Sequence, residues 1–211
     1  RWYVISLMLM TVATHVQGVV VAWQVYAVTK DALSLGLIGL AEALPFIATA
    51  LYAGHVVDRA DRRRVMLAAL WVLLAATMAL LLLTLRGGRA VWPFYVVIFV
   101  TGIARSFLMP ARTALGAELV PRDLYPNAVA WRSSTWQFAA VVGPAAGGLL
   151  YGFSGPAVSY AVDAGLLIAG VLALGRVRHT TRVVATASAS VRESLGEGIR
   201  WVRSQPIVLG A

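Results

Sequence analysis

Long apolar blocks separated by short polar breaks make up most of this chain. The clearest block is Val65–Leu85, 21 residues without a charged side chain. A helix of about 20 residues crosses the hydrocarbon core of a bilayer, which is about 30 Å thick. Six blocks have this character, and we predict a transmembrane helix for each: Tyr3–Val28, Leu35–Val57, Val65–Leu85, Val91–Arg112, Ala128–Phe153 and Pro156–Leu174. The pattern therefore predicts an all-α integral membrane protein with six transmembrane helices.

The composition supports the same fold class. Hydrophobic residues make up 60% of the 211 residues and charged residues 13%, whereas about a quarter of the residues in soluble domains are charged. The chain contains no Cys, which excludes disulfides and thiolate metal sites. His15, His55 and His179 are far apart in the sequence and lie in no metal-binding motif. We therefore expect neither a metal nor a cofactor.

The chain divides into three parts by hydropathy. Residues 1–175 hold the six predicted helices, and residues 176–205 are more polar. This polar part predicts a central cytoplasmic loop with an amphipathic helix, because apolar residues recur on one helical face at Val191, Leu195, Ile199 and Val202. Such a helix lies along the membrane surface, although an ordinary solvated connecting helix has the same pattern. Residues 206–211 look like the start of a seventh span, and we expect the chain to be a portion of a longer one.

The basic residues lie mostly in alternate connections. One side holds Arg59, Arg62, Arg63, Arg64, Arg122, Arg176, Arg178, Arg182, Arg192, Arg200 and Arg203, and the other holds Lys30, Arg86 and Arg89. Cytoplasmic loops carry the excess of Lys and Arg in membrane proteins. We therefore predict that both ends of the segment are cytoplasmic in a cell (inner) membrane. The net charge of +9 is then mostly loop charge, so we expect no nucleic acid partner.

The connection after the second predicted helix is dense in charge. Its sequence from Asp58 to Arg64 is DRADRRR. One interpretation is a simple topology anchor. Two details favour more: Gly54 lies one turn before Asp58, where a missing side chain suits close helix approach, and Asp61 can cap the next helix. We predict a conformational latch, in which these charges bind the end of a neighbouring helix and release it.

Two motifs in this order carry a family resemblance. Gly54-x-x-x-Asp58-Arg59-x-x-Arg62-Arg63 resembles the cytoplasmic signature of the major facilitator superfamily. The segment GPAAGG, with Gly143, Pro144, Gly147 and Gly148, is similar to the GPxxGG motif of the superfamily's antiporters and drug exporters. SLGLIGLAEALPF and NAVAWRSSTWQF resemble the bacterial subgroup that exports macrolides and siderophores. The chain departs from the pattern at Asp61, where the family usually has Gly, and at Gly102-x-x-Arg105 in place of Arg-x-x-x-Gly.

The resemblance implies a fold and a function. Members of the superfamily have twelve helices in two halves, each built from inverted three-helix repeats, so the chain resembles the N-terminal half. The implied function is a secondary active transporter, not an enzyme, that exports small, partly hydrophobic compounds such as a drug, antibiotic or siderophore. The implied mechanism is proton antiport with alternating access. The implied partners are the substrate, protons, the lipid bilayer and the C-terminal half of the same transporter.

Polar residues inside the predicted helices are the candidate site residues, because an ionisable group at bilayer depth costs about 2.5–3.5 kcal/mol on insertion scales. Arg105 is the candidate for holding an anionic group or modulating a carboxylate, although snorkelling to the interface is an alternative. In this superfamily first spans line the cavity, so Gln17, Trp23 and Gln24 are candidate substrate contacts. Interhelical hydrogen bonds are the commoner use of glutamines.

Glu42 and Asp163 are the candidates for proton coupling. Burial disfavours the ionised form of a carboxylate, which suits a group that takes up and releases protons. Glu42 also lies shortly before Pro45, which leaves a backbone carbonyl free about one turn back. A structural hydrogen bond is the alternative for both residues, and we favour it for Asp163 because sixth spans are usually peripheral.

Gly143 and Gly147 also lie one turn apart, a spacing that predicts close packing of the fifth helix against a neighbour. Pro144 is expected to kink that helix.

Two other functions fit parts of the sequence. The six-helix membrane domain of an ATP-driven exporter is the first, but these loops are short and the chain has no phosphate-binding P-loop. The second is an intramembrane serine protease, because residues 152–155 read GFSG. That chemistry needs a His base beside the Ser, and His179 is predicted at the opposite surface from Ser154.

Overall fold

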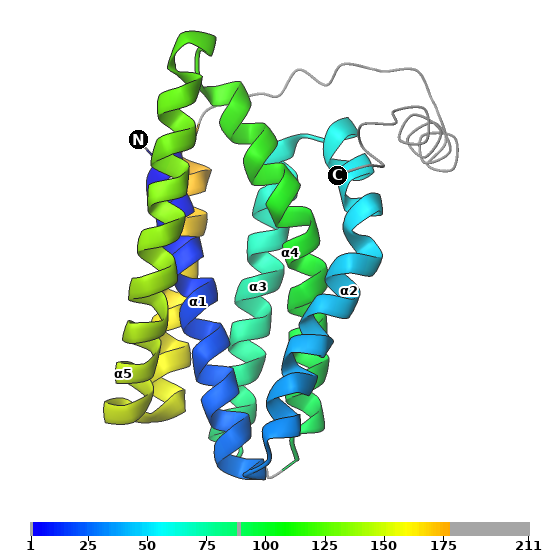
Figure 1. Ribbon diagram of the computed structural model, residues 1–211, viewed down its shortest axis with the longest axis vertical. Helices are drawn as coiled ribbons and strands as arrows, with labels where there is room; N and C mark the ends of the chain where they lie inside the picture. Colours follow the sequence, from blue (N-terminus) through cyan, green and yellow to red (C-terminus); the bar gives the residue numbers. More distant parts are fainter. Residues whose placement is uncertain (1, 88–89, 178–211) are drawn as a thin grey trace, which may run out of the picture.

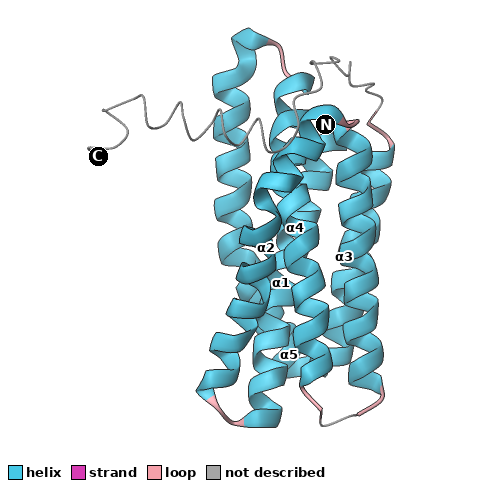
Figure 2. Ribbon diagram, turned by 90° about the vertical axis from the view of Figure 1, so that its right-hand side faces the viewer, coloured by secondary structure: helices cyan, strands magenta, loops and turns pink. Residues whose placement is uncertain are grey.

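The computed structural model describes residues 2–87 and 90–177 of the chain, and their secondary structure is entirely helical (Figures 1 and 2). The helices are α1 (Trp2–Thr29), α2 (Ala32–Arg59), α3 (Arg62–Leu85), α4 (Trp92–Leu119), the short 3₁₀ helix η1 (Arg122–Leu124) and α5 (Tyr125–Gly175). In the described part, five helices are long and apolar enough to cross a membrane. The predicted all-α membrane class is therefore confirmed.

The number of helices differs from the six predicted, because the last two predicted spans are joined in α5. This helix has 51 residues, and Gly155 within it has φ 77° and ψ 174°. Glycine adopts a positive φ without the steric cost of a side chain, and Pro156 supplies the fixed φ that suits the start of a helix. At this point α5 reverses direction at the lower end of the bundle in Figure 1. The predicted break falls at a backbone turn rather than in a loop.

The helices extend beyond the predicted spans at several ends. α4 continues past Arg112 to Leu119, and α2 begins at Ala32 and ends at Arg59. Hydropathy marks the residues inside the hydrocarbon core, whereas the helical backbone continues into the more polar interface. The predicted C-terminal end of α4 was therefore too early, and the predicted span for α2 was too short at both ends.

Two apolar clusters hold the bundle together. The first includes Met10, Leu70, Leu115 and Leu174, at the end where α2 connects to α3. The second includes Val16, Val20, Leu80 and Tyr160, toward the opposite end. The main helix contacts are α1 with α5, α2 with α4, and α3 with both α4 and α5. Large apolar side chains such as Phe153, Val141 and Ile47 stay exposed, as expected for a bundle surrounded by lipid.

The predicted close packing of Gly143 and Gly147 is confirmed. A Cβ added at Gly143 would lie 2.4 Å from Cβ of His15, and one at Gly147 would lie 3.1 Å from the carbonyl oxygen of Val16. Both glycines therefore let α5 approach α1 closely. Gly148 has open space around its Cα, and so does Gly54. The expectation that Gly54 permits a close helix approach was wrong for this arrangement of the described helices.

Candidate functional site

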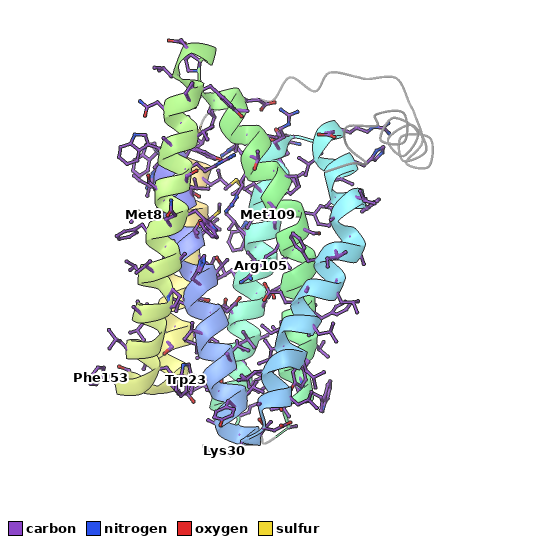
Figure 3. All side chains as sticks on the ribbon, in the orientation of Figure 1. Met8, Trp23, Lys30, Arg105, Met109 and Phe153 are labelled. Atoms are coloured by element: carbon purple, nitrogen blue, oxygen red, sulfur yellow. The ribbon has the colours of Figure 1, made fainter. Side chains whose placement is uncertain are left out.

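A pocket of about 340 Å³ lies among α1, α2, α4 and α5. Its polar lining comes from Thr11, Thr14, His15, Glu42, Arg105, Arg112 and Trp136. Figure 3 shows Arg105 about midway along the bundle, between α1 and α2, with Met109 nearer the end of the bundle that holds the start of the chain. Two arginines and one glutamate give the lining an excess of positive charge. Such a volume and such convergent polar groups are typical of small-molecule sites.

An ion pair between Arg105 and Glu42 is the main polar contact of this pocket. Nη1 of Arg105 donates a hydrogen bond to Oε1 of Glu42, and Nη2 donates to the carbonyl oxygen of Thr14 at 3.1 Å. The side chains are 22% and 30% exposed. The pair joins α2 to α4, and the bond to Thr14 adds α1. Arg105 therefore does meet a carboxylate.

Gly102 explains why α4 can bring Arg105 to Glu42. A Cβ at Gly102 would lie 2.4 Å from the carbonyl oxygen of Glu42 and 2.8 Å from Cγ of Pro45. The absent side chain lets the two helices touch one turn before Arg105. One turn further on, the hydroxyls of Thr49 and Ser106 are 2.7 Å apart, which adds a second polar contact between the helices. The Gly102-x-x-Arg105 order thus positions the ion pair.

The two glutamines of α1 face α3 and α5. Nε2 of Gln17 donates to Oγ1 of Thr77 at 2.8 Å, and Gln17 is buried. Nε2 of Gln24 donates to Oγ1 of Thr84 at 2.9 Å, and the hydroxyl of Tyr160 donates to Oε1 of Gln24 at 2.9 Å. These are the interhelical hydrogen bonds considered as the alternative for the glutamines. Their seven-residue spacing places both on one face, and that face is turned away from the pocket.

Trp23 also lies away from the pocket. Its side chain is exposed near the lower end of the bundle in Figure 3, and its ring centroid is 6.2 Å from that of Tyr151. The structure therefore brings together Arg105 and Glu42, and it leaves Gln17, Trp23 and Gln24 elsewhere. A substrate contact by these three residues stays a prediction.

Asp163 is buried against α3. Its Oδ2 accepts a hydrogen bond from Oγ1 of Thr77 at 2.8 Å, while its Oδ1 is buried without a partner in the described part of the chain. The same threonine accepts the hydrogen bond from Gln17, so the three residues join α1, α3 and α5. Arg105 is within electrostatic range of this carboxylate. The contacts agree with a structural use, and a role of Asp163 in proton coupling stays a prediction.

The charged connection between α2 and α3 binds the ends of two other helices. Asp61 caps α3 by accepting a hydrogen bond from the backbone nitrogen of Arg64 at 3.0 Å, which confirms the predicted cap. Arg62 pairs with Glu118 at the end of α4. Arg63 donates to the carbonyl oxygens of Leu174 at 3.3 Å and Gly175 at 2.6 Å, at the end of α5.

A helix carries a partial negative charge at its C-terminal end, so these arginines are well placed to hold α4 and α5. Asp58 and Arg59 are exposed at the end of α2. The contacts provide the holding half of the predicted latch. Release of the contacts stays a prediction.

Replacing Arg63 with Gln is expected to lower the transport rate of the full-length protein roughly fivefold, because a hydrogen bond contributes about 1 kcal/mol. The change removes the donors to α5 while the helix ends stay in place. The measurement is the initial transport rate in vesicles, normalised to the amount of inserted protein. Arg64→Gln is the matched control, because the Arg64 side chain is 85% exposed. Its Nε is 3.8 Å from Oδ2 of Asp61, which is too far for a hydrogen bond. Equal rates for the two variants would reduce the connection to a topology anchor.

Comparison with known families shows to which family the chain belongs. The model of the family described as transmembrane secretion effector matches residues 1–209. The chain belongs to this family of the major facilitator superfamily. The resemblance seen in the motifs is thereby confirmed, and the chain is placed in a family of transporters rather than of ATP-driven exporters or proteases.

The chain is similar to proteins named for macrolide efflux and multidrug resistance. Macrolide efflux protein A of Streptococcus pyogenes is 27% identical over 177 residues, which cover 83% of this chain and 44% of the relative. The protein of the same name from Enterococcus faecalis is 30% identical over 119 residues, 56% of this chain and 36% of the relative. Multidrug resistance protein 2 of Bacillus subtilis is 28% identical over 120 residues, which cover 57% of this chain and 29% of the relative. The chain spans less than half the length of these relatives.

Several pocket residues were not among the sequence candidates for the site. Arg112 lies two helical turns after Arg105, so the spacing argument applied to the glutamines would have placed it on the same face. Trp136 and His15 meet across the α1–α5 contact with ring centroids 6.4 Å apart. Nδ1 of His15 is 2.8 Å from the carbonyl oxygen of Thr11. No sequence signal places these two rings at a pocket, because their position depends on the packing at Gly143.

In the described part of the chain, no group of His, Asp or Glu side chains is arranged to hold a metal ion.

Proposed function

We propose that the chain is the N-terminal part of a drug efflux transporter that moves small, partly apolar compounds across the membrane in exchange for protons. The observation that carries this proposal is the Glu42–Arg105 ion pair in the wall of a pocket inside the bundle. An intramembrane ion pair is a functional hypothesis by default, because charges at this depth are costly. Family membership and the names of the relatives support the class of compound.

The ion pair suggests how a proton controls the arrangement of the helices. Ionised Glu42 holds Arg105 and so holds α2 against α4. Protonation removes the charge on Glu42, which leaves Arg105 partly buried without its partner and favours an arrangement in which the two helices part. A ligand shifts an equilibrium only by binding the two states differently. A proton and a substrate that favour different arrangements are then exchanged for each other by alternating access.

The greater length of the relatives supports the same proposal. We take the two arms of α5 on either side of Gly155 as separate spans, which gives six spans in this portion. The match to less than half of each relative leaves room for a C-terminal half of similar size. That half would cover the open side of the pocket.

Orientation follows from the basic residues. Arg62 and Arg63 lie at one end of the bundle with the ends of α4 and α5, and Arg176 lies over the Trp2 ring at 5.0 Å. Lys30 is at the opposite end in Figure 3. By the positive-inside rule we place the arginine-rich end in the cytoplasm of the cell (inner) membrane.

The orientation is tested with Arg64→Cys, which gives a single thiol because this chain has no Cys; any Cys in the rest of the full-length protein is replaced first. An impermeant thiol reagent is expected to label this position in everted vesicles and not in whole cells. Lys30→Cys is the matched control and should show the opposite pattern. Labelling of position 64 from outside intact cells would contradict the orientation.

The proposed function is tested with the full-length protein in reconstituted vesicles. The compounds are a macrolide, erythromycin, and three probes that share one apolar body: dansylaminoundecanoic acid, its primary amide and the corresponding amine. Imposing a pH gradient is expected to drive at least one of them against its concentration gradient. If none responds to the pH gradient, while a known proton-coupled exporter in the same vesicles does, the proposed exchange is wrong.

A further inference from the structure

Two arginines beside the pocket have no acidic partner among residues 2–87 and 90–177. Arg105 is paired with Glu42. The guanidinium groups of Arg112 and Arg132 make no hydrogen bond or ion pair with the rest of the described chain, and Nε of Arg112 is buried without a partner. Arginines within membrane bundles normally pair with a carboxylate or with backbone carbonyls. The partly buried guanidinium groups of Arg112 and Arg132 can therefore accept a partner from outside the described chain.

The two arginines lie on different helices, α4 and α5, and line two different pockets. Arg112 of α4 lines the main pocket together with Trp136 of α5. Arg132 lies one helical turn before Trp136 and lines an adjoining pocket of about 160 Å³ together with Tyr3. The hydroxyl of Tyr3 donates a hydrogen bond to the carbonyl oxygen of Arg112. Arg112 and Arg132 are each within electrostatic range of Tyr3 and of each other.

Gly116 fixes the position of Tyr3 in this group. A Cβ at Gly116 would lie 3.0 Å from the Tyr3 hydroxyl oxygen, so the absent side chain lets the tyrosine lie against α4. The tyrosine proton is used by the Arg112 carbonyl and is not available to a ligand. The N–H groups of the two arginines are therefore the donors that remain for a ligand.

The chemistry that satisfies two guanidinium groups within electrostatic range of each other is an anion. Two like charges repel each other strongly where the dielectric constant is low, and an anion between them replaces the repulsion with charge-assisted hydrogen bonds. The planar guanidinium fork matches a carboxylate particularly well. The surroundings are apolar, with Trp136, Phe46 and Met109 in the lining of the main pocket and Trp131 in that of the adjoining one.

We propose that Arg112 and Arg132 bind the carboxylate of an amphipathic substrate, whose apolar body lies in the main pocket along Trp136. The proposal rests on the proposed transport function and names its substrate class, an apolar carboxylic acid. The site is assembled while Glu42 is ionised and holds α4 against α2. Substrate and proton therefore favour different arrangements, as exchange requires. A cationic compound is excluded from this position by two positive charges.

The test is equilibrium binding to the full-length protein in phosphatidylcholine nanodiscs, where no anionic lipid competes. The probes are dansylaminoundecanoic acid and its primary amide, which differ only in the charge of the head group. The parent protein is expected to bind the acid about tenfold more tightly than the amide, since charge-assisted hydrogen bonds are the strong ones. Arg112→Gln and Arg132→Gln should each remove most of this preference without changing the affinity for the amide.

Two control variants make the outcome specific. Arg112→Lys keeps the charge without the planar fork, so it should retain part of the preference. Arg86→Gln removes a positive charge at the far end of α3 and should leave the preference unchanged. Equal affinity of the parent for acid and amide would overturn the proposal. An equal loss of affinity for both probes in Arg112→Gln would also overturn it, because the arginines would then be holding an acidic side chain of the longer protein in place.

The binding test is independent of the transport test. It needs no gradient. If the parent protein binds the acid selectively but its transport does not respond to a pH gradient, the proposed anion site is supported and the proposed proton exchange is wrong. If the pH gradient drives the amide as well as the acid, the proposed exchange is supported and the proposed anion site is wrong.

Discussion

Replacing Gly143 with Leu is expected to separate α1 from α5 and to prevent the full-length protein from reaching a stable, active form. Even a Cβ at this position would lie 2.4 Å from Cβ of His15, and the nearby backbone oxygen of Val12 would lie at 3.4 Å. Close packing of small residues is a main source of helix association in membranes. Overpacking costs typically about 1–3 kcal/mol and occasionally more. We therefore expect a loss of most transport and a clear drop in melting temperature.

The matched control for this change is Gly152→Leu in the same helix. Gly152 is exposed, and a Cβ there meets nothing within 4 Å in the described structure. The measurement is the melting temperature in detergent, followed by size-exclusion chromatography of heated samples. Gly147→Leu should fall between the two, because its Cβ contact is looser at 3.1 Å. If Gly143→Leu and Gly152→Leu melt at the same temperature, the packing account of α5 is wrong.

Replacing Glu42 with Gln is expected to abolish transport against a gradient while leaving substrate binding and exchange measurable. Gln has the shape of a protonated Glu but cannot release a proton. The variant also loses the ionised partner of Arg105, so the force that holds α2 to α4 in the present arrangement is removed. We expect the response to a pH gradient to fall to the level of vesicles without protein. The measurement is uphill accumulation and, separately, exchange of the transported compound.

Asp163→Asn is the comparison for that prediction. Asp163 accepts a hydrogen bond from Thr77, and the amide oxygen of Asn can accept the same bond. The effect on uphill transport should therefore be much smaller than that of Glu42→Gln. A loss of uphill transport in Asp163→Asn, with Glu42→Gln still responding, would transfer the coupling role to Asp163.

Sequence patterns predicted the helical spans because the bilayer leaves the backbone few choices. Every N–H and C=O group in lipid must be paired within the protein, so a long apolar block such as Val65–Leu85 becomes a helix. The Asp61 cap and the Gly143–Gly147 contact were also predicted, since both depend on spacing within one segment. The break at Gly155 was located from the SGP sequence, but the positive φ of Gly155, with helix directly before and after it, was not predicted.

The arrangement of the site needed the structure. Glu42 and Arg105 were both candidates, yet their pairing depends on the contact of α2 with α4 at Gly102. Periodicity shows which residues share a face but not which helix that face meets. For the same reason the sequence left Gln17 and Gln24 with two readings, a cavity contact or an interhelical hydrogen bond, and only the structure shows that their shared face bonds to α3 and α5. Gly54 was assigned to a helix contact that the described helices do not make.

Proton release on substrate binding tests the central claim most directly, because the claim is that substrate favours ionised Glu42 paired with Arg105. The transported compound is added to the full-length protein in weakly buffered detergent solution at mildly acidic pH, and the released protons are counted with a pH-sensitive dye. We predict that the parent releases up to about one proton per bound substrate and that Glu42→Gln binds the substrate but releases none. Equal release by the parent and by Glu42→Gln would contradict the account.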